Sequence, residues 1–251
     1  MRLRFGSSLV MKKAFSIIEL IFVLVVIGIL SAIILPSTKT NPLDEVAIQL
    51  LSHIQYTQHL AMSDDRYNAN RKNSDDAVIW YKERWQLVFS KSKFTDNQYA
   101  YTIFSDTAGE STGDASESEI AINPQNANQI MTGGYGDTKA IDIRDTDGFK
   151  GMPSLNIGKK YGISDVKLTE GCSYNRISFD YLGRPFTGKQ SSLDFPYQSD
   201  ISDSRKPGLI CENKGCEITL THNSSKTITL RITKETGFVC ILKEGTKECQ
   251  K

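Results

Sequence analysis

An apolar stretch at residues 15–35 constrains the fold more than any other part of the chain. It contains no Lys or Arg, so as an α-helix rising about 1.5 Å per residue it is about 31 Å long, the thickness of a bilayer's hydrocarbon core. Its one acidic residue is Glu19. A carboxylate in lipid costs roughly 2.5–3.5 kcal/mol on insertion scales, so we expect Glu19 to have a function. The stretch predicts a single membrane-spanning helix.

Charge is distributed unevenly along the chain. Lys12 and Lys13 directly precede the apolar stretch, and by the positive-inside rule they keep that end in the cytoplasm and place everything after Pro36 across the membrane. Four of the 30 basic residues precede Phe15, so the remainder has 26 basic against 29 acidic residues, a net charge of −3. This mildly acidic body has no general attraction to nucleic acid or to anionic lipid.

The cysteines all lie in the part predicted to be exported, where an oxidising compartment allows them to pair. Cys211 and Cys216 are close enough to staple a short loop, and Cys240 and Cys249 could close the C-terminal segment. Spacing alone does not fix the connectivity. The fifth cysteine is Cys172, and the odd count leaves at least one thiol over.

The segment around residue 15 resembles the processing signature of type IV pilins and of type II secretion pseudopilins. In that family a basic leader is removed after a small residue, directly before the apolar helix, and the new N-terminal Phe is methylated. Ala14 and Phe15 match the cleavage position, Glu19 the family's glutamate, Gly28 its mid-helix glycine and Pro36 its kink-forming proline. The family usually has Gly where this chain has Ala14.

The resemblance implies that a prepilin peptidase removes residues 1–14, or a shorter leader if translation starts at Met11. Cleavage creates an amine at Phe15, and Glu19 of a neighbouring subunit pairs with it in a medium of low dielectric constant. A secretory signal peptide fits poorly, because the apolar run is longer than a usual signal core and contains a carboxylate. The alternative that remains is a Glu19 side chain that only snorkels to the lipid headgroups.

Residues 36–68 predict an amphipathic continuation of the apolar helix, with Asn41 as a cap and Pro42 in the first turn. Apolar residues recur there at three- and four-residue intervals and predict one buried face: Leu43, Val46, Ala47, Leu50, Leu51, Ile54, Ala61 and Met62. His53 and His59, six residues apart, are interpreted as solvated. We therefore predict an α+β fold: a long N-terminal helix, transmembrane in its N-terminal half and amphipathic in its C-terminal half, packed on an antiparallel β-sheet head at residues 77–251.

Within the predicted head, residues 77–90 and 98–105 indicate two strands that begin a meander. Residues 106–138 contain no Lys or Arg and predict a long, acidic surface loop. Alternating apolar residues in 216–232 indicate half-buried antiparallel strands, followed by a turn at Thr236 and Gly237.

A second resemblance lies in residues 175–188. A strand ending at Phe179 is followed by Asp180, Gly183 and Arg184, which is similar to the F-D-x-x-G-R turn of the GspH/FimT group of minor pseudopilins. The strands of residues 216–241 resemble the same group, although less specifically. Residues 106–170 have no counterpart in it that we can identify.

Two further motifs suggest ligands. Trp80, Lys82, Arg84 and Trp85 mix basic and aromatic side chains and could form a stacking platform for single-stranded nucleic acid, or be half-buried strand aromatics with charged neighbours. Asp142, Asp145, Asp147 and Gly148 loosely resemble a calcium loop. The full ligand set and the terminal glutamate of an EF-hand are missing, so an Asp-Gly turn is the simpler explanation. We predict no metal or other cofactor beyond this calcium alternative.

No phosphate-binding glycine loop and no nucleophile with a recognisable base occur in the sequence, so we do not expect an enzyme. The resemblance implies a minor pseudopilin whose partners are other pilins, the prepilin peptidase and an inner-membrane assembly platform. Such a subunit lies in the bacterial inner membrane with its head in the periplasm, and belongs to a type II secretion, type IV pilus or DNA-uptake machine. The alternatives are a DNA-capturing minor pilin of natural transformation and a membrane-tethered sensor.

Overall fold

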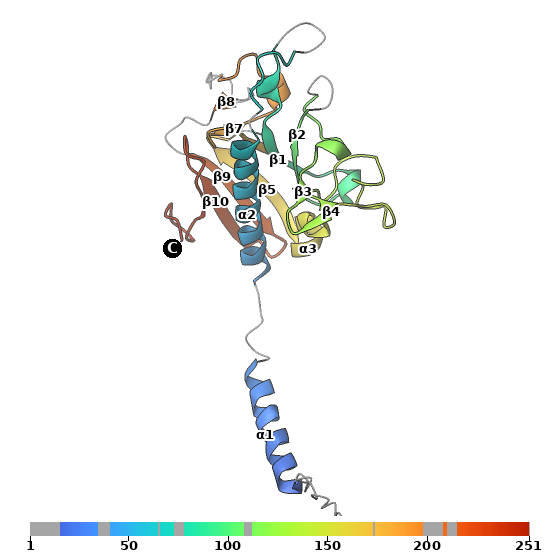
Figure 1. The fold of residues 1–251 in the computed structure, drawn as a ribbon. Coiled ribbons are helices and arrows are strands. Elements are labelled where there is room, and N and C mark those ends of the chain that lie inside the picture. The colour runs from blue at the N-terminus through green and yellow to red at the C-terminus, as the bar shows by residue number, and fades with distance from the viewer. Residues whose placement is uncertain are drawn as a thin grey trace, which may run out of the picture. The chain divides into compact units, whose positions relative to one another are not determined.

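The structure is a computed structural model. It describes residues 16–34, 41–64, 66–72, 78–107, 112–172, 174–197, 208–209 and 215–250. The chain divides into two compact units, residues 1–41 and residues 42–251 (Figure 1). The second unit is called the head below.

The first unit contains helix α1, Ile17–Ile34. The hydroxyl of Ser16 accepts a hydrogen bond from the backbone N–H of Ile18 at 3.3 Å and so occupies one of the amides that a helix start leaves unpaired. Glu19 lies in the first turn of α1, where the helix dipole favours an acidic side chain.

The prediction of one long N-terminal helix is wrong. Helix α1 ends at Ile34, and a separate helix, α2, begins at Pro42 and ends at Ser63. The sequence between them explains the division, because Pro36 and Pro42 each lack an amide donor and disfavour the helical conformation in the residue before them. Within the described part of the chain, no helix combines the length and the apolarity needed to cross a membrane.

Helix α2 is amphipathic, as its spacing predicted. Asp44 and Glu45 lie in its first turn. Met62, which the apolar pattern had included, is instead 48% exposed. The buried face consists of Leu43, Val46, Ala47, Leu50, Ile54, Thr57 and Ala61.

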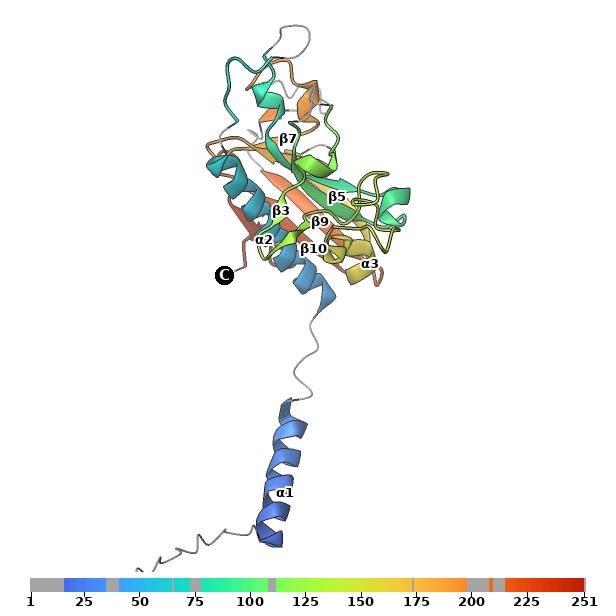
Figure 2. The ribbon, with the colours of Figure 1, turned by 45° about the vertical axis from the view of Figure 1, so that its right-hand side comes forward.

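Two antiparallel sheets form the body of the head (Figure 2). The five-stranded sheet has the order β2-β1-β6-β7-β8, with β1 at Trp85–Ser90, β2 at Ala100–Ser105, β6 at Arg176–Phe179, β7 at Pro185–Thr187 and β8 at Gly208–Leu209. The four-stranded sheet has the order β11-β10-β9-β5, with β5 at Ile163–Glu170, β9 at Cys216–His222, β10 at Thr227–Ile232 and β11 at Val239–Ile241.

The connections contain smaller elements. Strands β3, Ile122–Asn123, and β4, Asn126–Ile130, form a separate hairpin, and α3, Ile157–Tyr161, precedes β5. Five 3₁₀ turns complete the described elements: η2 Trp80–Lys82, η3 Lys93–Thr95, η4 Glu117–Glu119, η5 Pro153–Leu155 and η6 Gln190–Ser192.

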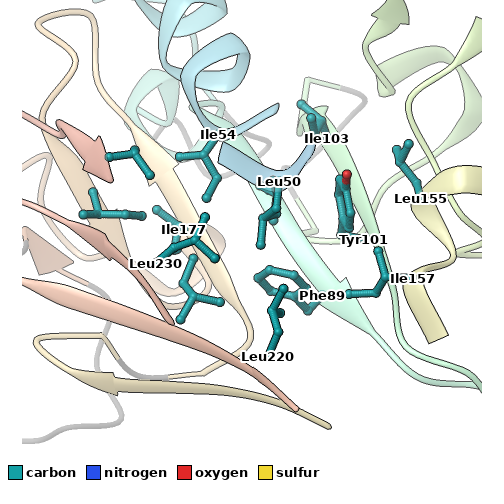
Figure 3. Close-up of a cluster of buried hydrophobic side chains, with 14 of the residues drawn as sticks. Leu50, Ile54, Phe89, Tyr101, Ile103, Leu155, Ile157, Ile177, Leu220 and Leu230 are labelled. Carbon is teal, nitrogen blue, oxygen red and sulfur yellow. The ribbon is translucent and has the colours of Figure 1, made fainter. Parts of the chain in front are cut away.

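The core of the head lies between α2 and both sheets. Figure 3 shows Leu50 and Ile54 of α2 among side chains of both sheets, including Phe89, Ile177 and Leu230. Burying a side chain of this size contributes about 1.5–3 kcal/mol, so α2 holds the two sheets together. The main core cluster is built from residues 43–239, all of them in the head, and both disulfides lie there too. The head therefore has what it needs to fold on its own.

Two predictions about the head need correction. Residues 80–82 form the turn η2 in place of the first half of a strand. The region 106–138 is more than a surface loop, because Ala121 and Met131 join the core beside β2 and the Ala121 N–H donates to the Ile103 carbonyl at 2.9 Å. The spacing of 98–105 and of 216–232 did identify β2, β9 and β10.

Candidate functional site

The side chains of α1 form an apolar surface on all sides of the helix. The large aliphatic and aromatic side chains between Ile17 and Leu30 range from 37% exposed at Val26 to 79% at Ile17. Gly28 has no atom within 4 Å of the position that a Cβ would occupy. A helix that is hydrophobic on every side is normally covered by other apolar groups. Glu19 is the single charged group on this surface.

Several residues of the predicted assembly signature lie outside the described residues. These are Ala14 and Phe15 of the cleavage position and Pro36 of the kink, together with Cys211 of the predicted staple. The two signature residues that the structure does describe, Glu19 and Gly28, both lie in α1.

The predicted nucleic-acid platform is not a surface. Trp80, Arg84 and Trp85 are 8%, 4% and 9% exposed, and only Lys82 is partly exposed. Trp80 and Tyr81 pack with Leu193 in a small hydrophobic cluster of their own. Because bases stack only on ring faces that solvent can reach, these side chains cannot serve as a stacking platform in this conformation.

Arg84 lies in an aromatic and polar enclosure. Its guanidinium carbon lies 3.9 Å from the centroid of the Phe186 ring, which is a cation–π distance. Nη1 donates to the side-chain carbonyl of Gln190 at 3.1 Å, and Nη2 donates to the backbone carbonyl of Pro196. Burial lowers the pKa of Arg84 to about 10, although the nearby carboxylate of Asp180 acts in the opposite direction.

The F-D-x-x-G-R segment, residues 179–184, forms a compact turn that we call the motif turn. Oδ1 of Asp180 accepts the backbone N–H groups of Leu182 and Arg184 at 3.0 and 2.8 Å. Oδ2 of Asp180 pairs with the Arg184 guanidinium at 2.7 Å, and this carboxylate is buried. The aspartate therefore both shapes the turn and fixes the arginine, which explains why the two occur at this spacing.

Gln58 of α2 links the motif turn to the last hairpin. Its side-chain amide donates to the carbonyls of Gly183 at 2.8 Å and of Thr236 at 2.9 Å. The first carbonyl follows β6 in the five-stranded sheet, and the second lies between β10 and β11 in the other sheet. One side chain thus fastens the end of α2 to both sheets.

The acidic loop at residues 142–148 has protein partners for its carboxylates. Asp142 accepts from the Arg144 guanidinium at 2.6 Å, and this hydrogen bond lowers the pKa of the Asp142 carboxyl. Oδ1 of Asp145 accepts the N–H groups of Asp147 and Gly148 at 3.2 and 2.8 Å, which is an Asp-Gly turn. Among the residues that the structure describes, no cluster of three or more His, Cys, Asp or Glu is arranged to hold a metal ion.

The disulfides differ in part from the predicted pairings. Cys172 pairs with Cys216, so Cys216 does not staple to Cys211. Cys240 pairs with Cys249, one of the arrangements that the spacing allowed. The first bond joins neighbouring ends of β5 and β9, whose pairing the sequence did not reveal.

The interpretation of His53 as a solvated histidine is wrong. His53 is largely buried: its Nδ1 lies 2.7 Å from the hydroxyl of the fully buried Tyr101, and burial lowers the pKa of His53 to about 4. Gln49 donates to the same hydroxyl at 2.8 Å and accepts from the hydroxyl of Tyr161 at 2.8 Å. His53 and Gln49 are four residues apart on one helix face, which was the available signal.

Comparisons with known proteins give no match: no family model, no curated protein and no solved structure resembles the chain significantly.

Proposed function

We propose that this chain is a minor, pilin-like subunit of a cell-envelope filament in a type II secretion, type IV pilus or DNA-uptake machine. Helix α1 is its assembly element, and the head gives it its place among the other subunits. The observation that carries the proposal is α1 itself, which is apolar on every side, exposes its large side chains and carries one acidic residue in its first turn.

The apolar surface of α1 requires a cover, because each exposed Leu, Ile or Val side chain stabilises an assembly by about 1.5–3 kcal/mol when it is buried. Copies of α1 from neighbouring subunits are a suitable cover. In such a bundle Glu19 needs a positive partner, and the amine created at Phe15 by leader removal supplies it. This pairing would set the axial register between subunits.

The architecture of the head supports separate roles for α1 and for the head. Its core cluster and both disulfides lie within residues 42–251, so α1 is available for assembly without loss of the head fold. The motif turn, with its Asp180–Arg184 pair, supports the placement near the GspH/FimT group. In this proposal the subunit waits at the bacterial inner membrane with its head in the periplasm, and its partners are a prepilin peptidase, an assembly platform and other pilins.

The decisive experiment is N-terminal sequencing of the full chain after co-expression with a prepilin peptidase. The proposal expects a mature chain that begins with N-methylated Phe15. A variant with Ala14→Glu, which places a bulky charge at the cleavage position, should keep its leader. An intact leader in the unaltered chain, or a cut after residue 35, would overturn the proposal.

A further inference from the structure

Strand β5 is an edge strand of the head. It lies at the end of the four-stranded sheet, and β9 is the one strand that pairs with it among the residues that the structure describes. Its 8 residues make it the longest of the described strands. The edge of a sheet presents unpaired N–H and C=O groups, so another extended segment can pair there.

The backbone of β5 directs alternate residues toward this edge. The N–H of Gly171 continues the β5–β9 pairing and donates to the Gly215 carbonyl at 2.7 Å. In an antiparallel pair, every second residue hydrogen-bonds to the partner strand and the residues between them point away. The N–H of Val166 accordingly donates to the hydroxyl of Tyr99, outside the sheet. No described residue hydrogen-bonds to the backbone of Leu168 on this side.

A groove of about 410 Å³ follows the same edge, and we call it the β5 groove. Val166 and Leu168 of β5 line one side, and the end of β1 with residues 174–175 lines the other. Tyr99 and Lys91 also belong to the lining. Protein sites that bind small ligands usually have volumes of about 300–1,000 Å³, so the groove has room for a short piece of peptide.

The core face of β5 is incompletely covered along the groove. Val166 and Leu168 pair with Leu220 and Ile218 of β9, and these two partners are 0% exposed. In contrast, Val166 and Leu168 are only partly buried, although they pack against the same core. A further strand beside β5 would cover both side chains and would hydrogen-bond to the backbone of Leu168.

The charges at this edge indicate an acidic partner. Lys167 is exposed on β5, and Nζ of Lys91 lies 4.9 Å from the centroid of the Tyr99 ring. Neither lysine forms a salt bridge with a described residue. Opposite charges on directly opposed strand residues are stabilising and like charges are destabilising. An added strand therefore fits best when an acidic residue faces Lys167.

A second copy of β5 does not meet this requirement. Pairing Val166 with Leu168 of another copy places two Lys167 side chains opposite each other, which is unfavourable. Pairing centred on Leu168 places Lys167 opposite Thr169, so the lysine stays without a counter-charge. Pairing that places Asp165 opposite Lys167 is centred on Val166, whose N–H already has an acceptor.

We propose that the β5 groove binds an extended, acidic segment of another protein, which adds to the four-stranded sheet as an outer strand. The segment hydrogen-bonds to the backbone of Leu168, and its apolar side chains cover Val166 and Leu168. Its acidic side chain faces Lys167, with Lys91 nearby in the groove. Tyr99 marks the end of the pairing, because its hydroxyl occupies the N–H of Val166. The proposal does not depend on α1, since all of these residues lie in the head.

The first test uses the head, residues 42–251, and the synthetic peptide acetyl-Thr-Val-Glu-Val-Thr-amide. Titration is followed by the amide resonances of the head in NMR spectra, and we expect a saturable displacement at Leu168. A peptide that is N-methylated at both valines keeps every side chain but cannot donate to the Leu168 carbonyl. It should bind at least about tenfold more weakly. No displacement at millimolar peptide, or equal affinity for the two peptides, would overturn the proposal.

The second test exchanges the charges. The unaltered head should bind the glutamate peptide about fivefold more tightly than a peptide with Lys in its place, and a Lys167→Glu variant should reverse this preference. Lys226→Glu is the matched control, because Lys226 is an exposed lysine between β9 and β10 and does not line the groove. An unchanged preference in the Lys167→Glu variant would contradict the placement of the peptide. A head that sediments as a dimer through β5 without peptide would identify a second copy as the occupant, and would also overturn the proposal.

Discussion

The Nδ1 atom of His53 lies 2.7 Å from the hydroxyl of Tyr101, in a part-buried position between α2 and β2. Their rings meet edge to face with centroids 5.8 Å apart. Tyr101 is fully buried, so its hydroxyl depends on His53 and Gln49 for hydrogen bonds. A protonated His53 at this position would add a charge to a site with little access to solvent, which is why burial lowers its pKa to about 4.

The pKa of His53 predicts a loss of stability in acid. In the unfolded chain the imidazole binds a proton near its ordinary pKa of 6.5, whereas in the folded chain it does so only near 4. Between these values the unfolded state binds more protons, so the free energy of unfolding falls as the pH falls from about 6.5 to about 4. The contribution is on the order of 3 kcal/mol at most. Urea unfolding of the head at a series of pH values measures it.

A His53→Gln variant, which does not titrate, should have a flatter stability profile in this window. His59→Gln is the control, because His59 is an exposed residue of the same helix and its removal should leave the profile unchanged. The comparison has to be made between variants, because burial raises the pKa of Asp106 to about 6 and contributes with the opposite sign. Equal slopes for the unaltered head and the His53→Gln variant would contradict the assignment.

Removal of the Gln58 side-chain amide is expected to lower the free energy of unfolding of the head. A Gln58→Ala change leaves the carbonyls of Gly183 and Thr236 without their donor, so we expect the head to lose about 1–2 kcal/mol of unfolding free energy. Gln55→Ala on the exposed face of α2 should cost less than about 0.5 kcal/mol. Urea titration distinguishes the two, and equal costs would show that the link between the turns does not contribute to stability.

Gly237 is a position where backbone conformation and space both require glycine. Its φ is +65°, and a Cβ there would lie 2.5 Å from Nε2 of Gln58 and 2.5 Å from the Gly183 carbonyl oxygen. Gly245 has a similar φ of +71° but nothing within 4 Å. A Gly245→Ala change should therefore cost only the strain of about 1–2 kcal/mol, and Gly237→Ala clearly more. Thermal unfolding of both variants separates conformational strain from steric overlap.

The two disulfides should contribute unequally. Cys172–Cys216 closes a sequence separation of 44 residues and Cys240–Cys249 one of 9, for which chain entropy predicts about 4 and about 3 kcal/mol. Paired Cys→Ala variants should therefore lose more stability when Cys172 and Cys216 are replaced. Peptide mapping under non-reducing conditions checks the connectivity itself, and a peptide that links Cys211 to Cys216 would contradict it.

The periodicity of apolar residues along the chain correctly predicted individual helices and strands. The three- and four-residue spacing of Leu43, Val46, Leu50 and Ile54 identified the buried face of α2, because a helix places such residues on one side. The alternation in 216–232 likewise identified β9 and β10. These predictions needed only the geometry of one element.

Features that depend on distant segments could not be predicted. Trp80 was interpreted as a strand residue and a possible stacking ring, yet Leu193, more than a hundred residues later, helps to bury it. Cys172 meets Cys216 because β5 pairs directly with β9 in the four-stranded sheet, although strands β6 to β8 of the other sheet lie between them in the sequence. The prediction of one long N-terminal helix was wrong for a different reason. The family resemblance favoured a continuous helix, whereas Pro36 and Pro42 oppose helix continuation locally.

Glu19 provides the sharpest test of assembly. If it pairs with the amine of Phe15 on a neighbouring subunit, Glu19→Gln removes the charge but keeps the size, and it leaves one buried charge without a partner. Breaking a buried pair costs about 3–5 kcal/mol, so recovery of partner pilins in a pull-down should fall by at least about tenfold. Leader removal should continue, because the cleavage position is intact. Ser31→Ala, elsewhere on α1, is the control and should assemble normally. Normal recovery of partners with Glu19→Gln would contradict the pairing of Glu19 with the amine of Phe15.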